Sequence, residues 1–245
     1  MSKLAATSAQ LARLGVVRAT LLVDESRTRA NIARFVDRAR RSHVALRPHF
    51  KTHQSAAVAA WFTDAGVTCA AVSRLGQADY FARHGWRDLT VAIGLNPREL
   101  AACAELADRS DLGVTVDHPD QIAALARAGV RCRVWVELDV GYGRAGCRWQ
   151  DGAALAALVG AIEAAPALVY AGLLTHAGHA YDQPPAAARD VFATTRERLD
   201  HARAGLVAAG LPGGLLSAGD TPGFAATADW SGLDEAALAT SCSTT

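Results

Sequence analysis

The stretch RCRVWVELDVGYGRAG, residues 131–146, contains the unit on which the fold prediction rests. Its first half, 131–138, is rich in β-branched and aromatic apolar residues and predicts a strand. Asp139, three glycines and Arg144 follow at once. A strand that ends in a polar, glycine-containing loop is typical of α/β proteins, in which functional residues follow the carboxyl ends of parallel strands.

The same unit recurs along the chain. Apolar runs predict strands at 43–47, 67–72, 88–93, 112–116, 131–138, 167–174 and 213–217. Ala-rich amphipathic segments predict helices at 27–42, 53–65, 74–84, 97–108, 118–128, 151–164 and 185–209, and a further strand is predicted at 17–24. Apolar strands that alternate with helices suit a parallel sheet covered by helices, either a doubly wound sheet or a (β/α)8 barrel.

The positions of the polar residues favour the barrel. They follow the ends of many predicted strands: Lys51, His53, Ser73, Arg74, Asn96, Asp117, His118, Asp139 to Arg144, His176 to His179, Asp220 and Thr221. A barrel distributes functional residues over one rim, whereas a doubly wound sheet concentrates them at a switch point. We therefore expect one α/β domain, a (β/α)8 TIM-like barrel. Seven strands are predicted from residue 43 onward, so we expect the barrel to be incomplete at strand 8.

Composition and charge argue against several classes of function. The 245 residues carry 25 Lys and Arg against 24 Asp and Glu, without a basic block, which argues against nucleic acid as a partner. No apolar run reaches about 18 residues, so we expect no membrane span, and residues 1–15 lack the apolar core of a secretory signal. The five cysteines are scattered without a CxxC spacing, which indicates reduced thiols in a cytoplasmic protein.

Lys51 is the first candidate for a catalytic residue. It lies in ALRPHFKTHQS, residues 45–55, beside Arg47, His49 and His53, with no carboxylate in the stretch. A lysine just past a strand is commonly a solvated surface residue, but neighbouring positive groups and partial burial would lower its pKa. A lysine with a lowered pKa is a nucleophilic amine suited to Schiff-base chemistry. We therefore predict that Lys51 is reactive and that its surroundings attract an anion.

Two later motifs predict contacts to a ligand. In VELDVGYGRAG, residues 136–146, the glycines would let the backbone approach a planar ligand while Arg144 hydrogen-bonds to it; a plain flexible loop is the alternative. In LLTHAGHAYD, residues 173–182, His176 and His179 could bind a metal, but the set of ligands is incomplete. Hydrogen bonding to a ligand or a phosphate suits this second motif better than zinc.

The last motif is SAGDTPG, residues 217–223. It predicts a tight turn whose N–H groups could form an anion site. A plain surface turn is an equal alternative. Asp220 is unfavourable in an anion site, because its carboxylate would repel a phosphate unless it is turned away.

The four motifs, in this order, resemble those of the fold-type III pyridoxal-phosphate enzymes, which have an alanine-racemase-like barrel. The chain looks most similar to the D-threonine aldolase and eukaryotic-type D-serine dehydratase group, from about residue 17 to about residue 235. The resemblance implies that Lys51 binds pyridoxal 5'-phosphate as a Schiff base, with His53 as a second catalytic candidate. It implies that Arg144 contacts the pyridine nitrogen. The other implied cofactor-binding residues are His176, His179, Tyr181, Gly219, Asp220 and Thr221.

The resemblance also implies an activity. We expect a lyase that acts on D-3-hydroxy amino acids, either by retro-aldol cleavage to glycine and an aldehyde or by dehydration. An amino-acid racemase and a non-catalytic carrier of pyridoxal phosphate are the alternatives. Relatives form homodimers and use a divalent metal, Zn or Mn, that is bound by a C-terminal β domain.

The end of the chain departs from the family pattern. We expect residues 1–245 to form the barrel domain without the C-terminal β domain and its metal ligands, and hence to be weakly active or inactive. The last residues, LATSCSTT (238–245), fit a coding string that in another frame gives GNFVFYD, a segment like one in the relatives. We therefore expect residues from about 236 on to be a frameshifted tail.

Overall fold

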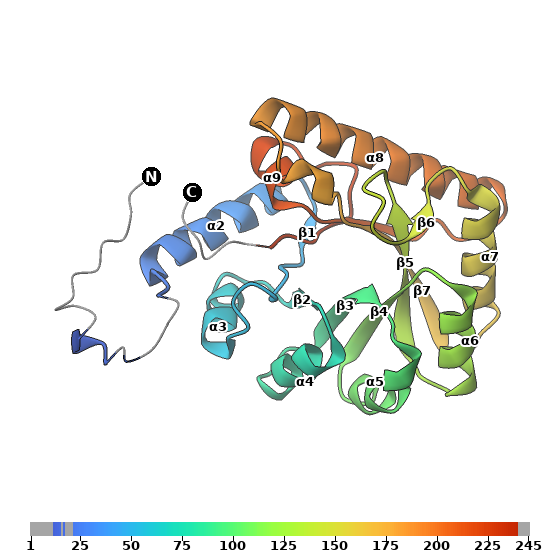
Figure 1. Ribbon diagram of the computed structural model, residues 1–245, viewed down its shortest axis with the longest axis horizontal. Coiled ribbons are helices and arrows are strands. Elements are labelled where there is room, and N and C mark those ends of the chain that lie inside the picture. The colour runs from blue at the N-terminus through green and yellow to red at the C-terminus, as the bar shows by residue number, and fades with distance from the viewer. Residues whose placement is uncertain (1–11, 16, 18–21, 240–245) are drawn as a thin grey trace.

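The computed structural model describes residues 12–15, 17 and 22–239, and its strands form a parallel barrel surrounded by helices (Figure 1). The strands are β1 (Ala45–Leu46), β2 (Cys69–Val72), β3 (Asp88–Gly94), β4 (Asp111–Val116), β5 (Cys132–Asp139), β6 (Cys147–Arg148), β7 (Leu168–Thr175), β8 (Leu215–Ala218) and β9 (Glu235–Ala236). The α-helices are α2 (Glu25–Arg41), α3 (Ala56–Asp64), α4 (Leu75–Arg83), α5 (Leu100–Ala107), α6 (Pro119–Arg127), α7 (Gly152–Glu163), α8 (Pro185–Ala208) and α9 (Thr221–Ala226). Two 3-10 turns, η1 (Pro97–Glu99) and η2 (Gly178–Ala180), complete the described elements.

The barrel strands pair in parallel in the order β1-β9-β8-β7-β5-β4-β3-β2, and β6 pairs with β5 outside this path. The two ends of the path, β1 and β2, meet at a parallel bridge between His49 and Ala71. At this bridge the Phe50 N–H donates to the Ala71 carbonyl at 2.8 Å, and the Ala71 N–H donates to the Pro48 carbonyl at 2.9 Å. The predicted (β/α)8 class is therefore confirmed, with a nearly closed seam between β1 and β2.

Alternation along the strands separates an outer core from a filled interior. On β5, Val134 and Val136 belong to the main hydrophobic core that packs against the helices, whereas Trp135 lies in a separate small cluster with Ala171. A Cβ on Gly113 of the neighbouring strand would lie 3.2 Å from the Trp135 indole nitrogen. A small residue at position 113 thus leaves room for the indole inside the barrel. A filled interior leaves the ends of the barrel as the places for a ligand.

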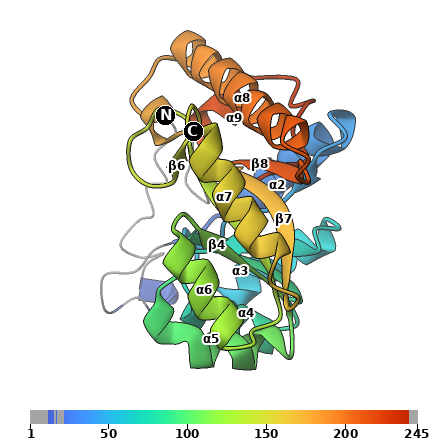
Figure 2. The same cartoon turned by 90° about the vertical axis from the view of Figure 1, so that its right-hand side faces the viewer.

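The helices begin where the sequence supplies side-chain caps. The Asp24 carboxylate accepts from the Arg27 N–H at the start of α2, and the Asp151 carboxylate accepts from the Ala154 N–H at the start of α7. Such caps satisfy N–H groups that a helix leaves free in its first turn. Figure 2 shows α6, α7 and α8 side by side along one outer face of the barrel.

The predicted elements from residue 27 onward are present, with ends that differ by a few residues. The predicted helix at 97–108 divides into η1 and α5, and the predicted strand at 17–24 lies mostly outside the described residues. The eighth barrel position holds β9, a strand of two residues that pairs with both β8 and β1. The prediction that the barrel is incomplete at its eighth strand is confirmed in this sense, since β9 has only two residues.

Residues 236–239 are part of the barrel wall. Ala236 and Leu238 are fully buried, and the His49 N–H donates to the Leu238 carbonyl at 2.7 Å. These contacts do not test the hypothesis of a frameshifted tail, which stays a prediction. Residues 240–245 lie outside the described part of the chain.

Ion pairs fill the N-terminal end of the barrel interior. The buried Arg47 guanidinium pairs with Asp88 and with Glu235, each at 2.7 Å. The Arg133 guanidinium pairs with the same Asp88 and, at 2.7 Å, with Asp111. Each arginine therefore faces two carboxylates, and these groups come from β3, β4, β5, β9 and the residue after β1.

Candidate active site

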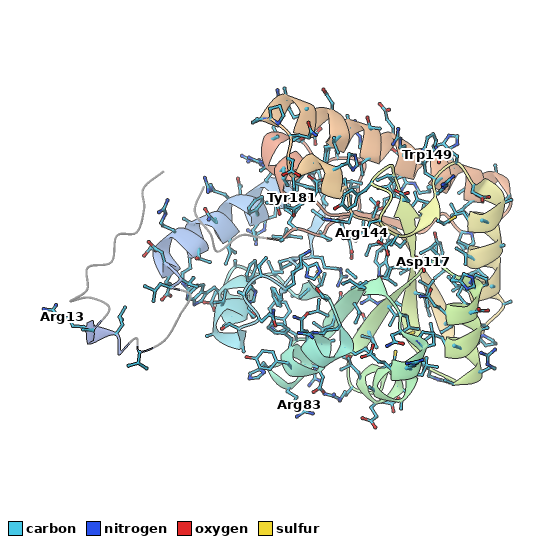
Figure 3. The ribbon with its side chains drawn as sticks, viewed as in Figure 1. Arg13, Arg83, Asp117, Arg144, Trp149 and Tyr181 are labelled. Atoms are coloured by element: carbon cyan, nitrogen blue, oxygen red, sulfur yellow. The ribbon has the colours of Figure 1, made fainter. Side chains whose placement is uncertain are left out.

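Most of the predicted site residues lie at the mouth of the barrel, the end at which the barrel strands have their carboxyl termini. Lys51 follows β1, Arg144 lies between β5 and β6, and His176 follows β7. Lys51 and Arg144 both act electrostatically on His176, so the three groups lie within range of one another. Figure 3 shows Arg144 near the middle of the molecule, between α8 and the helices α4 and α5.

Lys51 lies beside a buried, neutral histidine. The Lys51 backbone N–H donates to His49 Nδ1 at 3.3 Å, so the His49 ring proton belongs on Nε2. Burial, with the charges of Lys51, His176 and Arg144, lowers the pKa of His49 to about 3. His49 therefore adds no positive charge next to the lysine at neutral pH.

The pKa of the Lys51 amine is lowered below its ordinary value. Partial burial is the larger cause, and the positive charge of Arg144 adds to it. The expectation that Arg47 contributes is wrong, because its guanidinium lies at the other end of the barrel interior, paired with Asp88 and Glu235. A lowered pKa increases the fraction of neutral amine, which is the nucleophilic form.

The glycine-rich loop after β5 is fixed by the Asp139 carboxylate. One oxygen of Asp139 accepts from the N–H of Gly141 at 2.9 Å and from the N–H of Gly143 at 3.0 Å. Burial raises the pKa of Asp139, but the N–H groups of Gly143 and Gly141 outweigh burial and hold the pKa below its ordinary value. The loop is therefore an ordered structure, and the alternative of a plain flexible loop is not supported.

Gly146 ends the loop in a conformation that other residues rarely adopt. Its φ is +102°, and a Cβ there would lie 2.8 Å from the Asp139 nitrogen and 2.9 Å from the Glu137 carbonyl oxygen. Its N–H donates to the Asp117 carboxylate at 3.2 Å. Because Asp117 follows β4 and Asp139 ends β5, the loop is hydrogen-bonded to two neighbouring strands. Arg144 lies in sequence between the residues that make these hydrogen bonds, Gly143 and Gly146.

Arg144 contacts a buried acid and an aromatic ring. Its Nη2 donates to Glu137 Oε1 at 3.4 Å, and its guanidinium carbon lies 5.8 Å from the centroid of the Tyr142 ring. Burial raises the pKa of Glu137, and Arg144 partly offsets this. The Arg144 side chain is 46% exposed, so its other N–H donors are open to a ligand at the mouth.

His176 connects the loop after β7 to the turn after β8. Its Nδ1 hydrogen-bonds to the Gly219 carbonyl, and because a carbonyl only accepts, the proton lies on Nδ1. Nε2 is then an acceptor. Burial, with the charges of Arg144 and Lys51, lowers the pKa of His176 to about 4 against the effect of the Gly219 hydrogen bond.

The aromatic residues of the mouth surround His176 and His179. Tyr142 lies edge-on to the His176 ring at 6.0 Å and stacks on the His179 ring at 5.9 Å. Tyr181 lies 5.9 Å from the His176 ring and is 46% exposed. Burial and the charge of Arg198 lower the pKa of His179, and its buried Nδ1 has no partner among the described residues. Both histidines are thus kept neutral at neutral pH, and among the described residues the His176 ring has a hydrogen-bond partner, the Gly219 carbonyl.

The predicted phosphate turn is present, but its side chains are already engaged. The Thr221 hydroxyl donates to the Ala239 carbonyl at 2.8 Å, and the Gly219 N–H donates to the Thr175 carbonyl at 3.0 Å. Asp220 is fully buried and accepts from the Gly223 N–H as the N-cap of α9. The backbone N–H groups of Asp220 and Thr221 have no acceptor within the described chain, and they are the donors that this turn can offer an anion.

Burial of the Asp220 carboxylate is unfavourable when this group is ionised. Its Oδ2 is buried without a partner among the described residues, and burial raises the pKa of Asp220 to about 6 despite the Gly223 hydrogen bond. The side chain is turned toward its own helix, as an anion site would require.

His53 is the predicted site residue that the structure places apart. Its ring packs against Phe50, Phe62 and Phe81 at centroid distances of 4.7, 6.0 and 6.1 Å. Its Nδ1 accepts from the Ser55 N–H at 3.1 Å, and burial lowers its pKa to about 4. These contacts describe a packing role, and the catalytic role of His53 stays a prediction.

Sequence reasoning did not identify three residues of the mouth as site residues: His49, Glu137 and Tyr142. The signal for Glu137 was available, because Arg133, Trp135 and Glu137 are spaced by two and must share one face of a strand. Since that face is the barrel interior, its last member reaches the mouth.

The residues at the mouth fit pyridoxal phosphate. Lys51 offers an amine with a lowered pKa for the aldehyde, and Arg144 offers exposed donors for the ring nitrogen. The 219–221 turn offers the phosphate two N–H groups that have no acceptor among residues 22–239. Within residues 12–15, 17 and 22–239, no group of three or more His, Cys, Asp or Glu side chains is arranged to hold a metal ion. The use of a metal, which the resemblance assigns to another domain, stays a prediction.

Comparison with known proteins identifies the family. The model of the alanine racemase N-terminal domain matches residues 23–236. The chain belongs to this family. It is 34% identical over 220 residues to the D-threo-3-hydroxyaspartate dehydratase of Delftia sp. (strain HT23), a match that covers 87% of this chain and 58% of that enzyme. It is 30% identical over 164 residues to the D-threonine aldolase of Arthrobacter sp, covering 65% of this chain and 43% of that one.

The solved structures agree with this assignment. The Delftia dehydratase superposes with a TM-score of 0.83 at 32% identity, covering 88% of this chain and 58% of that chain. The D-threonine aldolase of Filomicrobium marinum superposes with a TM-score of 0.84 at 25% identity, covering 91% and 62%. The alanine-racemase-like barrel is therefore shown, and the chain spans about half the length of the curated relatives that it matches. None of the helices in the described part of the chain is long and apolar enough to cross a membrane.

Proposed function

We propose that this chain is the pyridoxal-phosphate-binding barrel of a lyase that acts on D-3-hydroxy amino acids. The relatives include proteins named as a D-threo-3-hydroxyaspartate dehydratase, a D-threonine aldolase and 3-hydroxy-D-aspartate aldolases. These names share a substrate class, a D-amino acid with a hydroxyl on Cβ. The observation that carries the proposal is the lowered pKa of the Lys51 amine beside the Arg144 guanidinium at the mouth.

The use of lysine in this chain supports the same role. The sequence holds two lysines, Lys3 and Lys51, and the other 23 of its 25 basic residues are arginines. Arginine keeps its charge in almost any protein environment, whereas lysine can lose its proton when it is buried. A lysine at the mouth therefore provides a chemical property that the arginines do not.

Other residues at the mouth would bind the ring nitrogen and the phosphate of the cofactor. When bound, pyridoxal phosphate would supply the electron sink for the bond that breaks at Cα of the substrate. Arg144 would hold the ring nitrogen by donating a hydrogen bond and, as a permanent cation, would keep that nitrogen from binding a proton. The N–H groups of Asp220 and Thr221 would hold the phosphate.

His176 is the residue that we propose to accept a proton from the substrate. With its proton fixed on Nδ1 by the Gly219 carbonyl, its Nε2 carries a free lone pair, and its pKa of about 4 keeps the ring neutral at physiological pH. In cleavage of a D-3-hydroxy amino acid, loss of the β-hydroxyl proton accompanies breakage of the Cα–Cβ bond, which gives glycine and an aldehyde. In dehydration, the Cα proton and the β-hydroxyl leave instead.

Product analysis tests the proposal. The purified protein with pyridoxal phosphate is incubated with D-threonine, D-serine, D-threo-3-hydroxyaspartate or D-alanine, with and without Zn²⁺ or Mn²⁺. Glycine plus an aldehyde would identify an aldolase, and ammonia plus an oxo acid a dehydratase. Racemisation of D-alanine alone would replace the proposal by a racemase. Cofactor binding with no turnover of any of the four would replace it by a carrier.

The proposals on partners follow from the same assignment. A small D-amino acid is the expected substrate. The family resemblance implies homodimers for the relatives and leaves the assembly of this chain open, and sedimentation of the purified chain would distinguish a dimer from a monomer.

A further inference from the structure

The two strands that hold Lys51 and the phosphate turn in place are very short. β1 and β9 have two residues each, and they pair in the register Ala45 with Glu235 and Leu46 with Ala236. A slip of one residue in a strand moves every side chain to the opposite face. Such a slip in β1 would turn the side chains from β1 to Lys51 from the interior of the barrel to its exterior, or the reverse.

The segment from β9 to Ala239 joins both parts of the site. On one side, the Arg47 N–H donates to the Ala236 carbonyl at 3.0 Å, and the His49 N–H donates to the Leu238 carbonyl at 2.7 Å. On the other side, the Ala237 N–H donates to the Ala218 carbonyl at 2.8 Å, and Thr221 donates to the Ala239 carbonyl. The position of Lys51 relative to the 219–221 turn therefore depends on the register of this segment.

One buried ion pair acts directly on that register. The Arg47 guanidinium donates to both oxygens of Glu235, at 2.9 and 2.7 Å, and both side chains are inside the barrel. The Arg47 side chain is 2% exposed and that of Glu235 is 7% exposed. In any other register this geometry is lost, and the Glu235 charge would be buried without its partner Arg47, which is strongly unfavourable.

We propose that Arg47 and Glu235 are positioning residues for Lys51. Their ion pair fixes the register between β1 and β9, and thereby sets the position of Lys51 relative to the 219–221 turn and keeps its amine within range of Arg144. Buried ion pairs often add little net stability over well-packed apolar residues, and their best-attested use is to select one register. The inference rests on the proposed function, because it treats Lys51 as the reactive amine.

Two variants test the ion pair, one by removing a single charge and the other by removing both. In Glu235→Gln one charge is lost, but the volume and one acceptor remain, and Arg47 keeps Asp88, which it contacts at 2.7 Å. In the double variant R47M/E235L both charges are replaced by apolar groups, and Asp88 keeps Arg133. Asp64→Asn is the matched control, because it breaks the exposed Arg29–Asp64 pair at 2.8 Å on the outer surface.

The first measurement is the pH dependence of reductive trapping of pyridoxal phosphate on Lys51, followed by peptide mapping. In both variants we expect trapping at neutral pH to fall by about tenfold or more, because an amine that moves out of its partly buried place beside Arg144 regains a pKa closer to that of a free lysine and holds its proton more firmly. Asp64→Asn should trap within about twofold of the wild type. A purely structural role would change thermal stability without shifting this pH profile.

The second measurement does not depend on the cofactor. Hydrogen exchange at the Arg47 and His49 amides reports directly on the ladder to β9, and we expect faster exchange there in the double variant while exchange in β3 to β5 is unchanged. If the wild type fails to trap pyridoxal phosphate, the proposed function fails, and the exchange result alone decides the positioning role. Wild-type trapping and protection in a folded double variant would overturn the inference. Failure of Glu235→Gln to fold would also overturn it, since the pair would then serve folding rather than position.

Discussion

The two ends of the barrel interior contain similar kinds of charged residues in opposite arrangements. At the N-terminal end, Arg47 and Arg133 face Asp88, Asp111 and Glu235, and every one of these charges has a partner. At the mouth, Lys51 and Arg144 act on each other and on two neutral histidines, and the nearby Glu137 contacts Arg144 at the long distance of 3.4 Å.

The difference shows how pairing decides what a charged side chain does. A buried cation with two carboxylates keeps its charge and holds strands together. A partly buried amine beside another cation is more readily deprotonated and can react. The sequence places both kinds of cation in one short stretch, since Arg47 and Lys51 are four residues apart and both follow the end of β1.

The largest effect is expected from the reactive amine itself. Lys51→Ala should abolish covalent binding of pyridoxal phosphate and lower any lyase activity by about 10³-fold or more, because no other group can replace the nucleophile. Lys3→Ala is the control and should retain both. Visible absorbance of the bound cofactor and product formation are the measurements. Retention of the absorbance in Lys51→Ala would show that the cofactor binds elsewhere.

The paired end should respond through stability instead. Arg47→Ala leaves Glu235 and part of Asp88 buried without a partner, which typically costs about 3–5 kcal/mol of unfolding free energy. Chemical denaturation with a circular-dichroism readout measures this cost. A loss below about 1 kcal/mol would mean that the network at this end is not the stabilising structure that its geometry indicates.

Removal of Arg144, the half-exposed cation at the mouth, should alter reactivity more than stability. Arg144→Met should lower activity by about 10²-fold, since one positioned donor is lost, and it should raise the pKa of Lys51, because the repulsion that lowers it is removed. Arg83→Met, at an exposed position on α4, is the control. The pH profile of cofactor trapping should move to higher pH in Arg144→Met alone, and an unchanged profile would contradict the electrostatic coupling.

Much of this comparison could be anticipated from the sequence, but not all of it. The order of strands and helices and the grouping of Lys51, Arg144 and His176 at one rim follow from apolar periodicity and from polar residues after strand ends. The role of Arg47 could not be read in this way. Its side chain lies at the opposite end of the barrel interior because it pairs there with Asp88 and Glu235, and Glu235 is 188 positions away in the sequence.

Two other features also depended on three-dimensional packing. His53 follows Lys51 by two residues, yet its ring enters an aromatic cluster that combines the nearby Phe50 with Phe62 of α3 and Phe81 of α4. β9 is too short to give a periodic signal, and its place is set by partners on both sides. Long-range pairing of short segments is the part of a fold that local patterns describe least.

The smallest effect concerns the unpaired carboxylate at the mouth. The pKa of Asp220 is raised to about 6, so between about pH 4 and pH 6 the folded protein retains a proton that the unfolded chain releases. Its contribution to stability is therefore greatest below pH 4 and falls as the pH rises to about 6. Asp220→Asn keeps the cap on Gly223 and should gain roughly 2 kcal/mol at pH 7 but little at pH 4. Unfolding curves at both pH values check this, and a less stable variant at pH 7 would contradict it.

The most direct test of the account is the site of cofactor attachment. The wild-type protein is incubated with pyridoxal phosphate, reduced with borohydride, digested and analysed by mass spectrometry. We predict that the phosphopyridoxyl group is found on Lys51 and not on Lys3. Attachment at Lys3, or equal labelling of both lysines at the rate of a free amine, would contradict the claim that the mouth of this barrel makes Lys51 reactive.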